Sequence, residues 1–263
     1  MATTHAPAPE SVQASVFIAD AALLDDSKTH SKFVGYLSTD QQTQLAARKR
    51  QKGYRQFLLS RVLVRAALRN WAGPRADSWV VAADAQGRPY LQAPTSQPLP
   101  SISVSHSGDC AICALSDRAG VGVDVEQIRP RDIDRLAADV LAESERHELA
   151  GTAAAQRLER FYQYWTLKEA YSKALGTGLA IPPRTMVFDL SNPELSSVCQ
   201  GTADVAHFLG FIPMPEFTAA LVLLVSDLKV QPTLRFQRLT ALDNFHVVAV
   251  EILHGTIQPD ALA

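Results

Sequence analysis

Cysteine, an excess of one charge and long apolar runs are all scarce in this sequence. Three of its 263 residues are cysteine, and the formal net charge is −2. So small a net charge gives no general attraction to nucleic acid or to a membrane surface. No apolar run approaches the roughly 20 residues of a membrane-spanning helix. The opening MATTHAPAPE has no basic segment followed by an apolar one, so we expect no secretory signal there.

The few cysteines also argue against a disulfide framework. Cys110 and Cys113 have the C-x-x-C spacing of dithiol redox sites, and Cys199 stands apart. The pair lies in a strand-like run, where an offset of three residues directs the side chains to opposite faces. We therefore expect small buried residues in a protein of the reducing cytoplasm.

The residues that are present predict an ordinary globular chain with repeated organisation. They are 47% apolar and 20% charged, and the length suits one large domain or two small ones. Helical patterns at 61–71 and 165–176 take similar places between groups of strands, which favours a duplicated architecture. We expect a disordered lead at 1–12, an N-terminal half at 13–120, a C-terminal half at 121–257 and a tail at 258–263.

Alternation of apolar residues and the positions of Gly and Pro predict the individual elements. We expect strands at 16–18, 79–83, 101–105, 110–115, 121–126, 184–190, 217–225, 234–239 and 245–253. We expect helices at 40–70 with an interruption near Gly53, at 132–142, from 144 and at 165–176. The strands at 101–105, 110–115 and 121–126 follow one another through short turns and predict an antiparallel meander.

The helical stretch FYQYWTLKEAYSKALGTGL at 161–179 carries unexpected charges. An advance of about 100° per residue gives it one broad apolar arc. Lys168 falls inside that arc, where a solvated lysine is not expected. Glu169 and Lys173 lie together at the edge of the arc, one turn apart. These charges need partners elsewhere in the chain.

The strand-like stretch at 121–126 offers such partners. Asp124 and Glu126 project from one face, roughly 7 Å apart by strand rise. Two such carboxylates resist ionising together unless a cation lies between them. With Glu169 they would form an oxygen set without His or Cys, which favours Mg²⁺ or Mn²⁺. Alone, the acids are typical of an exposed strand face, and Glu169 with Lys173 of an ordinary ion pair.

A basic segment precedes these motifs. For most of its residues we expect a solvated helix face, and sparse aromatic residues give little support to a nucleic-acid patch. The alternative is an anion site of one or two arginines. The basic residues are Arg48, Lys49, Arg50, Lys52, Arg55, Arg61, Arg65 and Arg69.

Two motifs together resemble a known family. Gly122-x-Asp124-x-Glu126, followed by Trp165-x-x-Lys168-Glu169-x-x-x-Lys173, is similar to the signature pair of 4′-phosphopantetheinyl transferases, and the single-chain spacing resembles the Sfp type. The resemblance implies an α+β fold of two similar halves with the active site at their interface. It implies transfer of the phosphopantetheine arm of coenzyme A to a serine of a carrier protein, releasing 3′,5′-ADP.

The resemblance also implies roles for particular residues. Glu169, Lys173 and Lys168 would be catalytic, and Asp124, Glu126 and Glu169 would hold Mg²⁺, or Mn²⁺. Arg55, Arg88, Ser105, His106 and Lys173 would bind the coenzyme. The last set rests on weaker matches: the helix around Arg55, the Gly87-Arg88-Pro89 loop and the Ser105-His106-Ser107 turn. The family has basic residues before the position of Arg55, where this sequence has glutamines at 41, 42 and 44. This departure weakens the prediction of the 3′-phosphate contacts and not that of the metal site.

Partners and alternatives follow from these roles. The acceptor would be an apo acyl or peptidyl carrier of fatty-acid, polyketide or nonribosomal peptide synthesis. We expect no nucleic acid or membrane partner, and a monomer, because a duplicated chain supplies both halves of the site. A coenzyme A or nucleotide binding module without catalysis and an ATP-dependent phosphoryl transferase stay open, although the P-loop pattern is absent.

Overall fold

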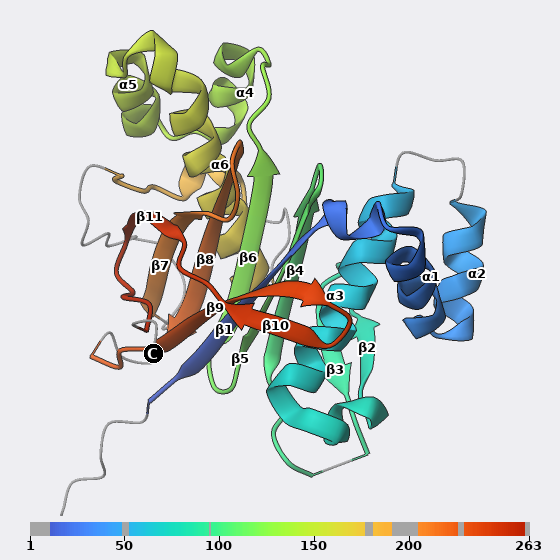
Figure 1. The fold of residues 1–263 in the computed structure, drawn as a ribbon. Coiled ribbons are helices and arrows are strands. Elements are labelled where there is room, and N and C mark those ends of the chain that lie inside the picture. The colour runs from blue at the N-terminus through green and yellow to red at the C-terminus, as the bar shows by residue number, and fades with distance from the viewer. Residues whose placement is uncertain are drawn as a thin grey trace, which may run out of the picture.

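The fold is a layered α+β structure with two sheets between two long helices. A computed structural model describes residues 11–48, 53–94, 96–176, 181–190, 205–225 and 229–260. The predicted lead at 1–12 therefore lies almost entirely outside the described residues. In Figure 1 the long helices α3 and α6 lie on opposite sides of the strands. None of the helices in these ranges is both long and apolar enough to cross a bilayer.

The first sheet contains strands from both ends of the chain. Its order is β10-β9-β1-β5-β4, with β1 antiparallel to β5 and parallel to β9. The strands are β1 (Gln13–Asp20), β4 (Ser101–Ser107), β5 (Cys110–Ser116), β9 (Thr233–Ala241) and β10 (Asn244–Val247). Thus β9 and β10, from the predicted C-terminal half, complete the sheet of the predicted N-terminal half.

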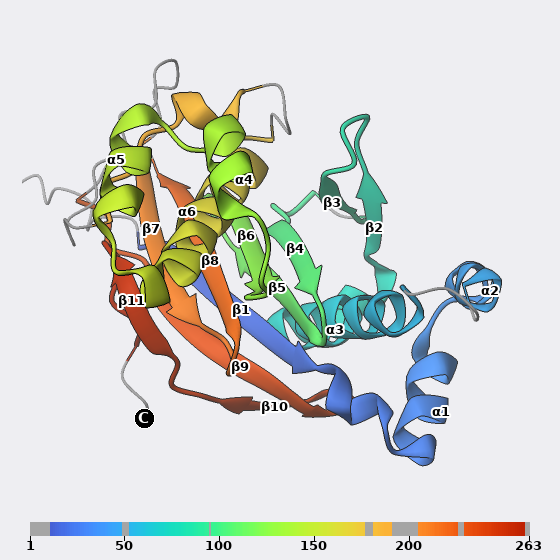
Figure 2. The same ribbon diagram turned by 90° about the horizontal axis from the view of Figure 1, so that it is seen from above.

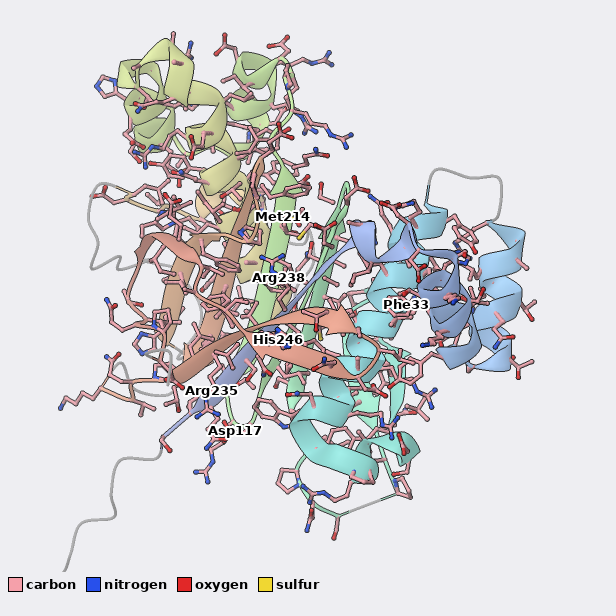
Figure 3. The ribbon with its side chains drawn as sticks, in the orientation of Figure 1. Phe33, Asp117, Met214, Arg235, Arg238 and His246 are labelled. Atoms are coloured by element: carbon pink, nitrogen blue, oxygen red, sulfur yellow. The ribbon has the colours of Figure 1, made fainter. Side chains whose placement is uncertain are left out.

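The second sheet has the order β11-β7-β8-β6, all antiparallel. Its strands are β6 (Gly120–Gln127), β7 (Val205–Ile212), β8 (Phe217–Val225) and β11 (Glu251–Gly255). A separate hairpin consists of β2 (Val80–Ala83) and β3 (Pro89–Gln92). Arg238 of β9 donates to the carbonyl of Pro213, between β7 and β8, and so joins the two sheets on that side (Figure 3).

The described residues form six α-helices, of which α3 and α6 pack on the sheets and the other four pack on these two. The six are α1 (Ser27–Tyr36), α2 (Thr39–Ala47), α3 (Tyr54–Ala72), α4 (Ile133–Val140), α5 (Glu143–Gly151) and α6 (Ala154–Leu175) among the described residues. Ser38 and Gln41 form a capping box at the start of α2, and Gly53 precedes α3, as predicted. Gly176 ends α6 with φ +69°, a left-handed conformation that favours glycine.

The period-2 alternation of the strands divides the core into layers. In β1, Val16 and Ile18 face the second sheet, while Phe17 faces α3, and all three are fully buried. Strands buried on both faces read as continuous apolar runs, which explains the sequence VFIA there. Figure 2 shows α3 against the first sheet and α6 against the second. The predicted burial of Cys110 and Cys113 is confirmed, and burial raises the pKa of the Cys110 thiol to about 12.

The expected α+β fold of two similar halves is confirmed by the strand orders. The sheet order β1-β5-β4 with α3 matches β6-β8-β7 with α6, and each long helix follows the first strand of its unit. In both units a hairpin returns to pair with that first strand.

One predicted strand pairing and two of the predicted strands are wrong. The strand at 121–126 does not complete a meander, because β6 pairs with β8 in the second sheet. The predicted strand at 184–190 contains a short 3₁₀ turn (Pro183–Thr185) instead, where two prolines remove backbone donors. The predicted strand at 245–253 is two strands, β10 and β11, which belong to different sheets.

One glycine sets the distance between α6 and the second sheet. A Cβ atom on Gly122 of β6 would lie 1.9 Å from the carbonyl oxygen of Ala170 and 2.5 Å from the amide nitrogen of Ala174. Both are backbone atoms of α6, so neither can move aside as a flexible side chain could. The absence of a side chain at Gly122 therefore allows the helix to rest directly on the strand.

We predict that Gly122→Ala destabilises the fold, because the added methyl group must push α6 away from β6. Overpacking of this kind costs about 3 kcal/mol, which corresponds to a loss of roughly 6–12 °C in melting temperature. Thermal unfolding followed by circular dichroism measures it. Gly35→Ala in α1 is the matched control, since a Cβ there meets nothing within 4 Å. An unchanged melting temperature for Gly122→Ala would show that the contact tolerates a methyl group.

Candidate active site

The candidate site lies where β4, the edge strand of the first sheet, runs beside β6, the edge strand of the second. The two strands are joined through serine side chains, which we call the serine seam: Ser103, Ser105 and Ser107. Their hydroxyl oxygens accept the backbone N–H groups of Val123 at 3.0 Å, Val125 at 3.4 Å and Gln127 at 3.1 Å. Backbone polar groups at a buried edge need such partners.

Two acidic side chains of β6 lie on this seam. Asp124 is 6% exposed, and its Oδ1 atom accepts the Ser105 hydroxyl at 2.7 Å. Glu126 is less buried, and its Oε2 atom accepts the Ser107 hydroxyl at 2.7 Å. Both carboxylates accept hydrogen bonds from serines of β4, which agrees with the prediction that they share one face of a strand.

Helix α6 brings a lysine and a third carboxylate to the same place. Lys173 Nζ donates to Asp124 Oδ1 at 2.7 Å and to the Val123 carbonyl at 3.1 Å. Glu169 lies one turn earlier on the same helix face. The close approach at Gly122 is what allows a side chain of α6 to reach β6 here.

The carboxylates influence one another electrostatically. Burial raises the pKa of Glu169, and the negative charges of Asp124 and Glu126 raise it further, against the opposing effect of Lys173. Burial also raises the pKa of Glu126, although the hydrogen bond from Ser107 acts in the opposite direction. Burial is the larger cause in both residues, and the neighbouring carboxylates act in the same direction.

The residues fit a divalent cation chemically, although the described residues do not already gather three ligands around one point. Asp124 Oδ2 is buried and finds no hydrogen-bond partner in the described part of the chain. Such an orphaned oxygen is costly unless something binds it. The available donors are carboxylate oxygens, the ligands that Mg²⁺ and Mn²⁺ prefer. In this structure the Lys173 ammonium group provides the positive charge beside Asp124.

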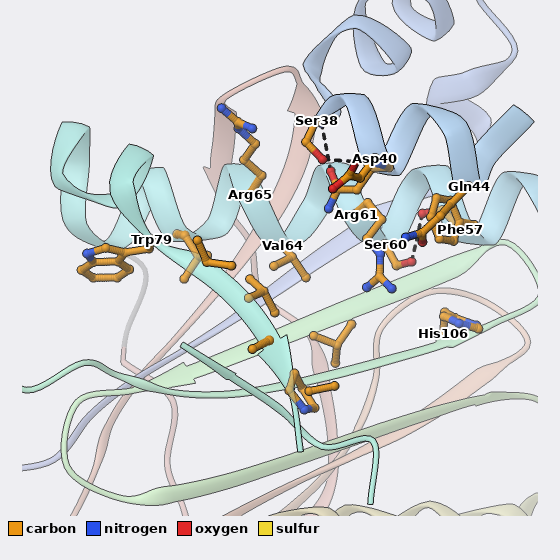
Figure 4. A pocket seen from close by; sticks show the side chains of 18 of the residues that line it. Ser38, Asp40, Gln44, Phe57, Ser60, Arg61, Val64, Arg65, Trp79 and His106 are labelled. Atoms are coloured by element: carbon orange, nitrogen blue, oxygen red, sulfur yellow. Dashed lines mark hydrogen bonds between the residues drawn. The ribbon is translucent and has the colours of Figure 1, made fainter. Parts of the chain in front are cut away.

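A large cavity opens beside the site, between α2, α3, the β2–β3 hairpin and β4. Its volume is about 800 Å³, within the range of small-molecule sites. Since side chains alternate along β4, Val104 and His106 face the cavity while the serine seam faces β6. Figure 4 shows His106 and Arg61 directed into this space. Burial lowers the pKa of His106, as do the positive charges of Lys173 and Arg61.

Two arginines that line the cavity share one aromatic ring. The guanidinium carbon of Arg48 lies 4.5 Å and that of Arg61 5.1 Å from the centre of the Phe57 ring. Burial and the charge of Arg48 lower the pKa of Arg61. Two cations held together in a cavity favour an anionic ligand. The sequence pattern placed both residues in a basic face and gave no signal that separates them from the solvated arginines.

The other predicted coenzyme ligands have protein partners. Arg88 Nη2 donates to the Ala174 carbonyl at 3.3 Å, near the end of α6. Arg55 Nη2 donates to the Ala21 carbonyl at 2.7 Å and to Asp25 at 2.8 Å. Arg88 follows Gly87, which lines the cavity, whereas Arg55 is not among the lining residues. Coenzyme contacts by Arg55, Arg88 and Ser105 stay predictions.

A buried ion pair explains why Lys168 lies inside the apolar arc of α6. It is 1% exposed, and its Nζ atom lies 2.7 Å from Oε2 of the buried Glu145 in α5. It also donates to the carbonyls of Pro183 and Met186. Glu145 in turn accepts the N–H of Phe188 at 2.8 Å. These contacts tie α5, α6 and the segment 183–188 together, and the structure does not bring Lys168 together with Glu169 and Lys173.

We predict that Glu169→Gln raises the melting temperature at pH 8 in a chelator, because it removes a carboxylate whose charge is disfavoured in the folded state. A raised folded-state pKa means that stability is full below the ordinary carboxyl pKa, about 4.3, and is lost as pH rises through the folded value. The advantage of the variant should therefore vanish near pH 4. Glu251→Gln on the exposed β11 controls for the loss of one charge. Identical melting curves for Glu169→Gln and the unaltered protein at pH 8 would contradict this.

Comparisons with known proteins place both halves in one family. Residues 120–212 match the model of the 4′-phosphopantetheinyl transferase superfamily, and residues 26–118 match that of the 4′-phosphopantetheinyl transferase N-terminal region. The two matched regions together exceed half of the chain, and they meet where the strands of the serine seam meet.

Individual relatives agree with these models. The chain is 31% identical to the 4′-phosphopantetheinyl transferase HetI of Nostoc sp. over 48% of its residues and 54% of that protein. It is 34% identical to a 4′-phosphopantetheinyl transferase of Bacillus subtilis over 36% of its residues and 41% of that protein. The chain thus spans about half the length of these relatives. A Bacillus anthracis holo-(acyl-carrier-protein) synthase, solved with CoA (3′,5′-ADP), is 25% identical over 41% of this chain and 96% of that one, with TM-score 0.37.

Proposed function

Because the chain belongs to the 4′-phosphopantetheinyl transferase superfamily, in its Sfp type, we propose that it transfers the phosphopantetheine arm of coenzyme A to a serine of a carrier protein. The observation that carries the proposal is the meeting of Asp124 on β6 with Lys173 on α6. These are two separate motifs of the signature pair, and they contact each other beside a cavity with cationic walls. The acceptor would be an apo acyl or peptidyl carrier domain.

The reaction requires a base, and we propose Glu169 for that role. The carrier serine oxygen forms a bond to the phosphorus of the phosphopantetheine phosphate. The bond from that phosphorus to the bridging pyrophosphate oxygen breaks, and 3′,5′-ADP leaves with that oxygen. The serine proton passes to the Glu169 carboxylate, directly or through water.

Charge must also be balanced at the pyrophosphate. When bound, Mg²⁺ or Mn²⁺ would neutralise the negative charge that develops during phosphoryl transfer. Asp124, Glu126 and Glu169 are the residues that we propose to hold it, and the orphaned Asp124 Oδ2 supports this. Lys173 is proposed to donate a hydrogen bond to the phosphate bridge as the leaving group departs. Lys168 would then assist indirectly, by fixing α6 through Glu145.

The cavity is the proposed seat of the coenzyme. His106 and Arg88 are the cationic or donor groups that the resemblance indicates, and the cavity adds Arg48 and Arg61. Arg55 would have to exchange its bonds to Asp25 and to the Ala21 carbonyl before it could meet a phosphate. We propose that a single chain suffices, since the carboxylates and the cavity belong to the same chain. The free cysteines are consistent with work in the cytoplasm.

We predict that the full chain adds one phosphopantetheine to the acceptor serine of an apo-carrier protein in the presence of coenzyme A and Mg²⁺. Intact-mass spectrometry of the carrier measures the addition. A chelator and the Asp124→Asn variant should each abolish it, and Mn²⁺ should restore it after chelation. A carrier whose acceptor serine is replaced by alanine is the control. Transfer that continues unchanged in excess chelator would refute the proposed cation dependence.

We predict that His106→Asn weakens coenzyme A binding roughly tenfold or more, because hydrogen bonds to charged groups contribute about 1.5–3 kcal/mol. Burial lowers the pKa of His106, and an imidazole ring in either protonation state carries an N–H group that can donate a hydrogen bond to a phosphate. Steady-state kinetics should show a raised KM for coenzyme A and a smaller change in kcat. His246→Asn on β10, away from the cavity lining, serves as control. A change in kcat without a change in KM would assign His106 a role other than binding.

A further inference from the structure

We propose that Ser105 and Ser107 are positioning residues, which fix one oxygen of each seam carboxylate and leave the other open to a divalent cation. The inference rests on the proposed function for its meaning, but its evidence is the hydrogen bonding of β4 and β6. Ser105 was expected to contact the coenzyme. That contact stays a prediction, and the hydrogen bond from Ser105 to Asp124 adds a second role, the orientation of this carboxylate.

The orientation of each hydroxyl is determined by two bonds at once. A serine hydroxyl has one hydrogen to donate and lone pairs that accept. Ser105 accepts the N–H of Val125, and Ser107 accepts the N–H of Gln127. These backbone groups cannot rotate, because β6 is held by its ladder to β8. Each hydroxyl is therefore left to donate its single hydrogen toward the neighbouring carboxylate.

The consequence for Asp124 is a sharp difference between its two oxygens. Oδ1 accepts from both Ser105 and Lys173, each at 2.7 Å. Oδ2 is buried and has no hydrogen-bond partner among the described residues. Two donors on Oδ1 restrain the rotation of this carboxylate and leave Oδ2 as the oxygen that could bind a cation. Ser107 holds Oε2 of Glu126 in the same manner.

The third serine of the seam provides an internal control. Ser103 is 3% exposed and accepts the N–H of Val123 at 3.0 Å, as its neighbours accept theirs. Asp124 and Glu126 directly precede the residues whose N–H groups Ser105 and Ser107 accept. The residue in the same place for Ser103 is Gly122, which has no side chain. No carboxylate contact to Ser103 is present among the described residues. Loss of Ser103 thus removes a seam contact without touching a carboxylate, which separates stability from positioning.

The pairing between the serines of β4 and the residues of β6 is also visible in the spacing of the two sequence motifs. Ser-x-Ser-x-Ser at 103–107 lies beside Gly-x-Asp-x-Glu at 122–126, so the two motifs advance together by two residues. Alternation directs all three serines to β6 and the residues between them to the opposite face. Outer hydrogen bonds to ligating carboxylates orient them, and their loss typically costs roughly 10–100-fold in metal affinity.

The test compares Ser105→Ala with Ser103→Ala in the full chain. Mn²⁺ is the probe, and electron paramagnetic resonance titration gives its dissociation constant with and without saturating coenzyme A. We expect Ser105→Ala to weaken Mn²⁺ binding roughly 10–100-fold. Ser107→Ala should weaken Mn²⁺ binding by a smaller factor. Ser107→Thr, which keeps a hydroxyl group, should bind Mn²⁺ as the unaltered protein does. Ser103→Ala should bind Mn²⁺ as the unaltered protein does. Melting curves check that each variant folds.

Several outcomes would overturn the inference. Equal loss of Mn²⁺ affinity in Ser103→Ala and Ser105→Ala would mean that the serines act only by joining the sheets. Unchanged affinity in Ser105→Ala, or no Mn²⁺ binding by the unaltered protein under either condition, would contradict positioning directly. Failure of the proposed function would look different: Mn²⁺ affinity would still separate Ser105 from Ser103, while no carrier protein gained phosphopantetheine.

Discussion

The backbone contact between α6 and β6 at Gly122 is the constraint on which the rest of the site depends. Side chains normally hold a helix some distance above a sheet, and short acidic side chains on the strand could not then meet residues of the helix. Here the helix backbone lies directly against the strand. Lys173 therefore reaches both the carboxylate of Asp124 and the main chain of Val123. The opposite face of β6 is held by Val121 and Val123 in the core between the sheets, so the strand cannot retreat from the helix.

The serine seam satisfies a different constraint, which arises because the edges of the two sheets meet inside the molecule. An edge strand presents unpaired backbone groups, and proteins must cover or pair them. A full ladder between β4 and β6 would merge the two sheets, and apolar side chains would leave β6 donors unsatisfied. Serine hydroxyls are short enough to bridge and can both accept and donate. The result is a polar strip in an otherwise apolar interior, which is where buried acids such as Asp124 can be tolerated.

Local pattern could predict much of this fold, because alternation and glycine positions act over a few residues. It predicted β4, β5, β6, the break at Gly53 and the end of α6 at Gly176. It could not predict that β6 leaves the first sheet, because its partner β8 lies far along the chain and strand pairing is not a local property. Likewise, the apolar arc marked Lys168 as unusual, but nothing in the pattern identified Glu145 as its partner. Arg48 and Arg61 stand out from other arginines through the cavity that they line, which is a tertiary feature.

The charges of the site connect these constraints to the proposed chemistry. Three acids lie near one ammonium group, and burial, with a smaller contribution from the neighbouring negative charges, raises the pKa of Glu126 and of Glu169. A coenzyme pyrophosphate would add negative charge to this cluster, so it binds favourably only together with added positive charge. A divalent cation, in contrast, is attracted by the negative charge of the same cluster. Each of the two should therefore strengthen the binding of the other, since favourable coupling between two ligands is reciprocal. Lys173, which now neutralises Asp124, would in that state be released in part toward the phosphate. One lysine can thus neutralise Asp124 and act on the leaving group, if the seam keeps Asp124 in place when the lysine shifts.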